Sequence, residues 1–472
     1  MKNIKCILAS IFSLLITISL FAAPKQWHGF KCSEFVFEGR AGAFVEPDNP
    51  RKDGAWIWKP AFWGAFPDFD IEMLKRGYRF VYCNFTHDYA NPKSIEAGGR
   101  FVDFAVREFN LSNKVSIEGM SRGGAYTLCF ANRFPEKVAA VYVDAPVCDF
   151  SIWPGSKDAK LRADYFAKHN KADDGKFESS PIYNYKNLAK SGVPVWSVCG
   201  DADKTVPIEK NFYVYRKLLE DAGGISMLTV KNGCGHHPHG LKDPSPSADF
   251  VDRRQPSYMA KQYINLRENF GASLEKFKTT RTGRVGFVGG SVAETKALCN
   301  MAKDDLQRRF PFTQFEFVES GINATDATFR IGNDIISKGK VDLLFIDISA
   351  NGVGDTQIRG FEGEIRNILE ANPSCDVVLM YSFTIPTQNS RSIRAIEIVE
   401  TVANHYKIVS IDLAKEIKQR MNDGEFDCRL DNAYCSSLAN KLCAAAIANM
   451  FDAAQARNRN SPKKTPYLLP KK

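Results

Sequence analysis

The stretch "KVSIEGMSRGGAYTLCFANRFP" (residues 114–135) carries the pattern most informative about the fold. An apolar run typical of a buried strand leads into Gly119-Met120-Ser121-Arg122-Gly123, and an amphipathic stretch typical of a helix follows. A serine between glycines at a strand-to-helix turn is the pattern of a nucleophile elbow. The turn lifts the serine hydroxyl above the sheet, and the N–H of Arg122 can face a developing oxyanion. The alternative is an ordinary strand-to-helix loop.

Short apolar strands alternate with helical patterns on both sides of this stretch. In the N-terminal half, strands are expected near residues 54–60, 78–85, 114–119, 138–146, 193–200 and 226–233. Continuous apolar strands separated by helices favour a mostly parallel sheet with helices on both faces. The polar, irregular segment 151–185 is expected to pass over the sheet as a lid or as a wall of a substrate site.

A second alternating unit follows the charged segment 271–283, which we interpret as a linker. Its strands are expected near residues 284–291, 314–321, 341–349, 375–383 and 406–413. A chain of 472 residues is long for one hydrophobic core. We therefore expect one α/β domain at 24–270 and a smaller α/β domain at 284–455.

The two ends of the chain differ from these domains in composition. Residues 1–23 join Lys2 and Lys5 to an apolar run that ends in small residues, which predicts a secretory signal peptide. An uncleaved membrane anchor is the alternative. Residues 456–472 form a basic, proline-rich tail that is expected to be disordered. Secretion or a periplasmic location follows, with no membrane partner after cleavage of the signal peptide.

The net charge of +9 belongs mainly to these ends, which hold eight basic residues and no acidic residue. The two domains together are nearly neutral. A nucleic-acid-binding surface is therefore not expected. Nothing in the sequence indicates the oligomeric state.

A nucleophilic serine needs a base, and the base needs an acid that orients it. In a fold with a nucleophile elbow these residues follow in the order serine, acid, histidine. "GDADKTVP" (200–207) comes directly after a predicted strand, at the edge of the sheet where active sites lie. Asp203 is the expected acid, and Asp201 is expected to hold the turn.

The base is expected in "GCGHHPHG" (233–240), which follows the last predicted strand of the first domain. His236 is the predicted base, with His237 and His239 as alternatives. A metal site is the competing interpretation. Adjacent histidines would point apart in an extended segment, however, and the sequence offers no second group of ligands. Neither a metal nor another cofactor is expected.

A second oxyanion donor is expected in the loop after "WIWKP" (56–60). Pro60 has no N–H to donate. Ala61 or Phe62 is therefore the candidate, alongside Arg122.

Three stretches together resemble a family of exported bacterial α/β-hydrolases. They are "EGMSRGGAYTLCFANRFPEKVAAVYVDAPVCDF" (118–150), "VCGDADKTVP" (198–207) and "GCGHHPHGLKDPSP" (233–246). The resemblance covers about residues 30–255 and implies an α/β-hydrolase fold with serine-esterase chemistry. Members of this family are mostly predicted esterases found among polysaccharide-degrading genes, so the resemblance also implies a glycan ester as substrate.

The second domain resembles the SGNH (GDSL-type) hydrolases, which have a flavodoxin-like α/β fold. Ser291 in "RVGFVGGSVAE" matches the nucleophile, and Gly321 and Asn351 match the glycine and asparagine that bind the oxyanion. The last block of the family is Asp-x-x-His, and here it reads "RLDNAYCSS", with Asp431 as the acid and Tyr434 in the histidine position.

Tyrosine has an ordinary pKa of about 10 and does not readily accept a serine proton near neutral pH. His405 is the only histidine of this half, and its position at a predicted helix end suits a surface residue. We therefore interpret the second domain as degenerate, with three candidate roles: packing against the first domain, lining its cleft, or binding glycan without cleaving it. Residual activity through a rearranged base is the alternative.

The sequence predicts an exported serine carboxylesterase with Ser121, His236 and Asp203 as its catalytic residues. A peptidase of the prolyl oligopeptidase type would use the same residues, although no propeller domain is found in the sequence. A glycan-binding protein without catalytic activity is the alternative from a different class.

Overall fold

The structure is a computed structural model that describes residues 25–255, 263–289, 297–321, 339–347, 355–381, 390–413, 415–417 and 437–457. The predicted signal peptide and most of the predicted tail lie outside these residues, as do Ser291, Asn351, Asp431 and Tyr434. Within the described part, every helix is too short or too polar to cross a membrane. The nine cysteines described are all free thiols.

The first sheet has nine strands in the order β1-β2-β3-β5-β4-β6-β7-β8-β9. The strands are β1 (Lys25–Trp27), β2 (Phe30–Phe37), β3 (Arg40–Glu46), β4 (Trp56–Lys59), β5 (Arg79–Cys83), β6 (Val115–Met120), β7 (Val138–Asp144), β8 (Pro194–Gly200) and β9 (Ile225–Lys231). β4 lies between β5 and β6 and pairs with both in parallel, and β6 pairs in parallel with β7. β1, β2 and β3 are antiparallel to their neighbours.

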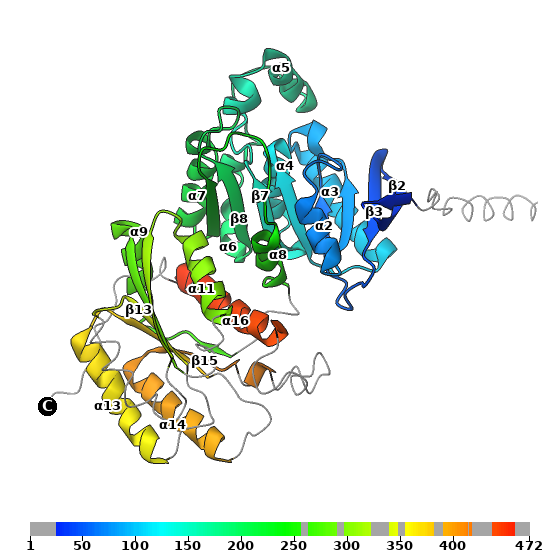
Figure 1. Ribbon diagram of the computed structural model, residues 1–472. Helices are drawn as coiled ribbons and strands as arrows, with labels where there is room; N and C mark the ends of the chain where they lie inside the picture. Colours follow the sequence, from blue (N-terminus) through cyan, green and yellow to red (C-terminus); the bar gives the residue numbers. More distant parts are fainter. Residues whose placement is uncertain are drawn as a thin grey trace, which may run out of the picture. The chain divides into compact units, whose positions relative to one another are not determined.

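Helices cover both faces of this sheet (Figure 1). They are α2 (Asp68–Lys75), α3 (Pro92–Phe109), α4 (Ser121–Arg133), α6 (Lys186–Ser191), α7 (Phe212–Asp221) and α8 (Ser245–Asp252). α4 packs against β6, β7 and α3. A mostly parallel sheet with helices on both faces is the predicted α/β-hydrolase architecture.

The apolar runs that predicted the central strands form the core of this sheet. Trp56, Ile57 and Trp58 in β4 are each at most 1% exposed. The Trp58 ring contacts Phe101 and Phe130, each with ring centroids 5.0 Å apart. Because β4 is buried on both faces, all of its residues are shielded from water, including the charged Lys59.

The segment 151–185 forms a separate layer, which projects beyond the sheet at the top of Figure 1. It contains η3 (Ser151–Gly155), α5 (Ala159–Lys168) and η4 (Pro181–Tyr183). Tyr165, Phe166 and Phe177 anchor it in a buried cluster that also includes Tyr89 and Phe150. This anchoring holds the layer in place without the support of a sheet.

The second sheet has six strands in the order β10-β15-β14-β13-β11-β12. The strands are β10 (Ile264–Asn265), β11 (Thr282–Gly289), β12 (Gln314–Gly321), β13 (Leu343–Asp347), β14 (Asp376–Met380) and β15 (Val409–Ile411). All pairings from β11 to β15 are parallel. Counted from β11, the order is 2-1-3-4-5, which is the doubly wound order of flavodoxin-like domains.

Helices α9 (Ala272–Thr280), α11 (Ala297–Arg309), α13 (Asp355–Ala371), α14 (Ser390–Tyr406) and α16 (Ser437–Arg457) accompany this sheet. Residues 271–283, predicted as a linker, instead form α9 and the start of β11. Leu274 and Phe277 lie three residues apart on one face of α9 and are both buried in the core beneath the second sheet. Burial of this face explains why the segment is folded.

By its internal contacts the chain divides into two compact units. The first comprises Met1–Tyr185, Gly200–Tyr215 and Gly233–Ala248, and the second comprises Lys186–Cys199, Arg216–Asn232 and Asp249–Lys472. Every residue of the candidate active site described below belongs to the first unit. The second sheet belongs to the second unit.

Candidate active site

Ser121 occupies a sharp turn between β6 and α4. It is the first residue of α4, and its φ of 50° lies in the left-handed region that L-residues rarely adopt. A Cβ on Gly119 would lie 2.5 Å from Thr127 Oγ1 and 2.8 Å from the carbonyl oxygen of Gly123. Gly119, two residues before the serine, is therefore needed for β6 and α4 to approach each other. Strained backbone at a serine that begins a helix is the geometry of a nucleophile elbow.

Ser121, His236 and Asp203 form one chain of hydrogen bonds. Nε2 of His236 lies 3.1 Å from Ser121 Oγ, and Nδ1 of His236 lies 2.6 Å from Asp203 Oδ2. The three residues come from the turn after β6, the loop after β8 and the loop after β9. Because the acid holds one ring nitrogen, the other is directed at the serine hydroxyl, as a general base requires.

Asp203 is held as a carboxylate by its own surroundings. The residue is 6% exposed, and its Oδ1 accepts hydrogen bonds from the N–H groups of Thr205 and Val206, both at 2.8 Å. Burial acts to raise the pKa of Asp203, but the hydrogen bonds from His236 and from these N–H groups outweigh it, so the pKa is lowered from its usual value. The negative charge therefore persists to stabilise a protonated His236.

Asp201 has a different partner from Asp203. Its Oδ1 accepts a hydrogen bond of 2.6 Å from the N–H of Gly233. Asp201 therefore ties the loop after β8 to the loop after β9.

A second acid–histidine pair lies beside the first. Nδ1 of His239 is hydrogen-bonded to Asp144 Oδ1, and Asp144 Oδ2 accepts from the N–H of Gly240 at 2.9 Å. His239 is 8% exposed and Asp144 is 1% exposed. The sequence analysis did not single out Asp144. Its position at the carboxyl end of β7 could have indicated it, since that edge carries the active site in parallel α/β sheets.

The histidine loop is bent at several positions rather than extended, so the argument that His236 and His237 point apart does not apply. Their ring centroids lie only 5.0 Å apart. The loop also approaches the end of β8 very closely. A Cβ on Gly200 would lie 2.2 Å from the carbonyl oxygen of Cys234 and 2.6 Å from that of Gly235.

The serine opens into a cavity of about 400 Å³. Its lining residues are Phe62, Ala65, Phe66, Met120, Ser121, Arg122, Trp153, Leu161, Thr205, His236, His237 and His239. Trp153 and Leu161 come from the segment 151–185, which was predicted to be a lid or a substrate wall, and they form part of the wall of this cavity. A cavity of this size with mostly apolar walls and a few converging polar groups suits a small substrate.

The two candidates for the second oxyanion donor differ in position. Phe62 lines the cavity and has a φ of 56°, whereas Ala61 is 1% exposed and does not line it. The Arg122 guanidinium lies over the Phe62 ring, 5.6 Å from its centroid. The wall beside Ser121 therefore combines an aromatic ring with a positive charge.

The candidate residues of the second domain are mostly outside the described residues. Gly321 is the exception and ends β12, where it pairs with Gly289 at the end of β11. Ser291 follows Gly289 by two residues in the sequence. His405 lies near the end of α14, with its ring 4.8 Å from that of Tyr406.

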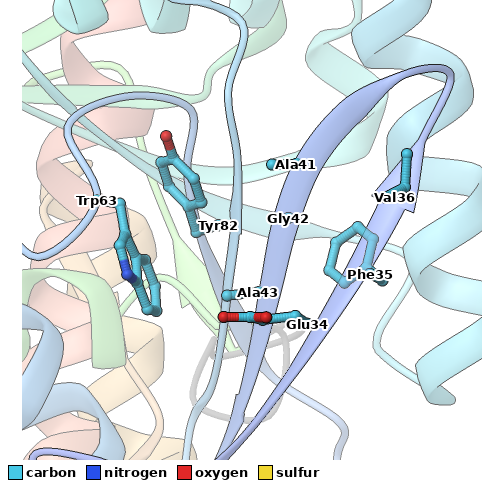
Figure 2. Close-up of a pocket in the computed structure, with 8 residues that line it drawn as sticks. All are labelled: Glu34, Phe35, Val36, Ala41, Gly42, Ala43, Trp63 and Tyr82. Atoms are coloured by element: carbon cyan, nitrogen blue, oxygen red, sulfur yellow. The ribbon is translucent and has the colours of Figure 1, made fainter. Parts of the chain in front are cut away.

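A second cavity, of about 420 Å³, lies over β2, β3 and β5 (Figure 2). Its walls are mainly aromatic and aliphatic, with Trp63 and Tyr82 opposite Phe35 and Glu34. It contains no histidine or cysteine, so it offers no nucleophile–base pair.

The fold and the Ser121–His236–Asp203 chain of hydrogen bonds define a serine hydrolase of the α/β-hydrolase type. The match of part of the chain to a protein-family model agrees with this class. Residues 101–262, which contain all three side chains, match the prolyl oligopeptidase family. No curated protein matches the chain.

Solved structures of several hydrolases are similar to the chain. An acylaminoacyl peptidase of Pyrococcus horikoshii is 16% identical with a TM-score of 0.39, over 54% of this chain and 44% of that one. A puromycin-hydrolysing peptidase of Mycobacterium tuberculosis is 14% identical with a TM-score of 0.40, over 49% and 40% of the two chains. An S-formylglutathione hydrolase of Agrobacterium tumefaciens is 14% identical with a TM-score of 0.36, over 49% and 95%.

The chain therefore spans less than half the length of the two peptidases. At these identities and TM-scores, the likeness carries no information about substrate.

Proposed function

We propose that the protein is an exported serine carboxylesterase that hydrolyses acyl esters on carbohydrate. The observation that carries the proposal is the hydrogen-bonded chain of Ser121, His236 and Asp203, of which Ser121 and His236 line a cavity of about 400 Å³. The N-terminal sequence supports export. The resemblance of residues 30–255 to exported esterases supports the glycan ester.

The mechanism follows from the positions of the three side chains. Nε2 of His236 takes the proton of Ser121 as Oγ attacks the ester carbonyl carbon. The backbone N–H groups of Arg122 and of the 61–62 loop stabilise the oxyanion, and the position of Phe62 in the cavity wall favours its N–H over that of Ala61. His236 then protonates the departing alcohol, and water activated by the same nitrogen releases the acid.

The second domain is proposed to be an SGNH-like domain that has lost its base. β11 and β12 run in parallel and end side by side at Gly289 and Gly321, and Ser291 follows Gly289 by two residues in the sequence, which supports the match to the first two blocks of the family. Tyr434 in place of the family's histidine supports the loss of hydrolytic activity. A domain that keeps the fold of this family but lacks the base would bind the glycan without cleaving it.

A peptidase is the second candidate function. The match of residues 101–262 to the prolyl oligopeptidase family favours it, and the same three residues would catalyse cleavage of an amide. The two functions differ in leaving group, since an ester releases an alcohol and a peptide releases an amine.

The experiment compares the wild-type chain with Ser121→Ala and Ser291→Ala on two substrates, a short acyl aryl ester and an aminoacyl-proline anilide. We expect hydrolysis of the ester, a loss of about 10⁶-fold in kcat for Ser121→Ala, and little change for Ser291→Ala. Preference for the anilide would favour the peptidase. Loss of activity in Ser291→Ala alone would place the working site in the second domain, and no hydrolysis by any protein would favour a binding role.

A further inference from the structure

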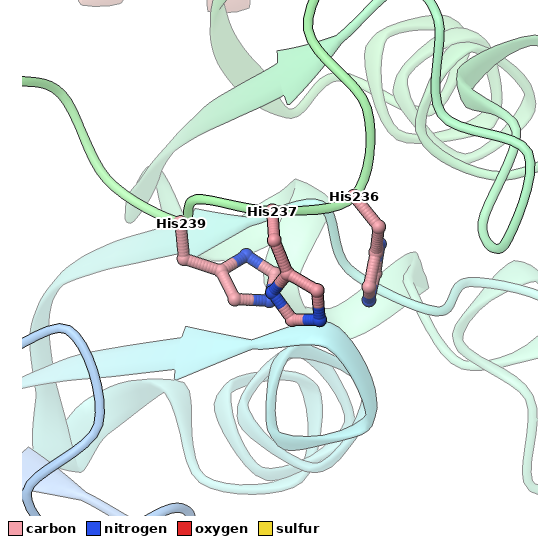
Figure 3. Close-up of side chains that lie close together, drawn as sticks. All are labelled: His236, His237 and His239. Carbon is pink, nitrogen blue, oxygen red and sulfur yellow. The ribbon is translucent and has the colours of Figure 1, made fainter.

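Three histidine side chains meet in the cavity beside Ser121. One ring nitrogen from each of His236, His237 and His239 lies within 4.8 Å of those from the other two. The ring centroids are 4.9–5.0 Å apart. Figure 3 shows that all three side chains project from the same side of the loop. Three converging imidazoles are a common ligand set for a transition metal ion.

Two of these rings are oriented as metal-binding histidines are. Asp203 holds Nδ1 of His236, and Asp144 holds Nδ1 of His239. In metal sites, a ligating histidine usually donates its other N–H to a carboxylate, which fixes the tautomer and makes the free nitrogen a better ligand. Nε2 of both rings is therefore left without the proton and can bind a metal. Nε2 of His236 is hydrogen-bonded to Ser121, and no partner for Nε2 of His239 is seen among the described residues.

His237 supplies a third ligand that is free to adjust. The residue is exposed, and its ring stacks on Phe66 at 5.5 Å with an interplanar angle of 12°. Nitrogen ligands of one zinc ion lie about 3.4 Å apart, since Zn–N bonds are about 2.0–2.1 Å, so a modest ring rotation completes the site.

We propose that His236, His237 and His239 bind one zinc ion, or a similar divalent transition metal ion, as a reversible inhibitor of the hydrolase. Inhibition follows because Nε2 of His236 cannot coordinate a metal and accept the proton of Ser121 at the same time. The fourth position of a tetrahedral ion would face the cavity and hold water. The inhibitory role rests on the proposed function, whereas binding of the ion does not.

Binding is measured by calorimetric titration of Zn²⁺ into Ser121→Ala, which keeps all three histidines and has no turnover. We expect one ion per chain. His237→Ala and His239→Ala in this background should weaken binding by about 100-fold or more, and Asp144→Asn should weaken it by about 10–100-fold. His28→Ala is the matched control, because His28 is an exposed histidine that does not line the cavity, and it should bind as the parent does.

Zn²⁺ should also inhibit ester hydrolysis by the wild type, and a chelator should restore it. No binding to Ser121→Ala would overturn the site, and so would binding that neither His237→Ala nor His239→Ala weakens. If the buried His239 variant fails to fold, His237→Ala alone still decides the second of these outcomes. Binding without inhibition would overturn the inhibitory role. No hydrolysis even without zinc would overturn the proposed function, while the titration would still decide the metal site.

Discussion

Asp203 and Asp201 lie two residues apart in the loop after β8 but have different partners. Asp203 is hydrogen-bonded to Nδ1 of His236, and Asp201 accepts from the N–H of Gly233. Only the first contact sets which nitrogen of His236 faces Ser121. Asp203 therefore orients the base, whereas Asp201 holds the loop that carries the base.

Asp203→Asn is expected to lower kcat for the aryl ester by about 10⁴-fold, because an amide can donate to Nδ1 and leave the proton on the nitrogen that faces Ser121. Asp201→Asn is the matched control, and its kcat should change less than about tenfold. Steady-state kinetics with both variants tests this expectation. Equal losses in the two variants would show that Asp203 acts only through the fold of the loop.

At the scale of elements, the active site depends on how closely the histidine loop passes the end of β8. Gly200 makes this approach possible, because a side chain there would collide with the backbone of the loop. Gly235, in the loop itself, has open space around its Cβ position. A side chain is therefore excluded at Gly200 but has room at Gly235.

Gly200→Ala should displace the histidine loop and lower kcat by about 100-fold or more, since a shift of about 1 Å in a catalytic group has an effect of this size. It should also lower the free energy of unfolding by about 1–3 kcal/mol. Gly235→Ala should leave both close to those of the wild type. Kinetics and urea denaturation of the two variants measure these effects, and an active, stable Gly200→Ala would contradict the close approach.

The layer formed by residues 151–185 contributes Trp153 to the wall of the cavity. Trp153→Ala should raise KM for the aryl ester by about tenfold, which is about 1.4 kcal/mol of binding, and should leave kcat nearly unchanged. The neighbouring Ile152, which does not line the cavity, serves as the control through Ile152→Ala. A fall in kcat with no change in KM would mean that Trp153 supports the catalytic residues instead of the substrate.

For the molecule as a whole, one feature that bears on stability is a buried ionic cluster at the centre of the first sheet. Lys59 of β4 lies 2.7 Å from Asp70 of α2 and 3.4 Å from Glu118 of β6, and all three side chains are at most 2% exposed. Burial acts to lower the pKa of Lys59, but the charges of Asp70 and Glu118 outweigh it and raise the pKa. The lysine is therefore charged and dependent on its partners.

Lys59→Met should lower the free energy of unfolding by about 3–5 kcal/mol, because it leaves a buried carboxylate without its counter-ion. Lys31→Met is the control. The Lys31–Glu46 pair also has a separation of 2.7 Å, but its side chains are 59% and 40% exposed, so the loss should be at most about 1 kcal/mol. Urea denaturation measures the free energy of unfolding of both variants. Equal losses would show that burial does not make the Lys59 cluster more important for stability than the exposed pair.

Glu118 makes the stability of the chain depend on pH. Burial and the nearby charge of Asp70 raise its pKa well above the usual value, despite the opposing charge of Lys59. An acid with a raised pKa in the folded state contributes stability that is complete below its unfolded pKa, about 4.3, and is lost as pH rises through the folded pKa.

The difference in unfolding free energy between the wild type and Glu118→Gln should therefore shift against the wild type as pH rises. Glutamine cannot ionise, and its amide resembles the protonated carboxyl group in shape. Denaturation of both proteins at a series of pH values above about 4.3 tests the sign. A difference that does not change with pH would show that Glu118 is ionised throughout.

Sequence patterns were sufficient for the parallel strands of both sheets, because buried parallel strands are continuous apolar runs that stand out between helices. They were not sufficient for the antiparallel β1–β3 at the start of the chain or for α9. β2 alternates buried and exposed residues, and α9 has only a narrow apolar face. Such segments are recognised by what they pack against, which depends on residues far away in the sequence.

Local sequence patterns were enough to predict the strand-to-helix turn at Ser121 and the order in which an acid and a histidine-rich loop follow it. These features are local, because they depend on glycines and on the position of a loop after a strand. Tertiary structure alone decided which histidine contacts the serine, that Asp144 pairs with His239, and that three imidazoles converge in one cavity. The first two contacts join loops from different strands, which only the folded sheet brings together. The convergence of the three imidazoles depends on the bends of the histidine loop, which that packing sets.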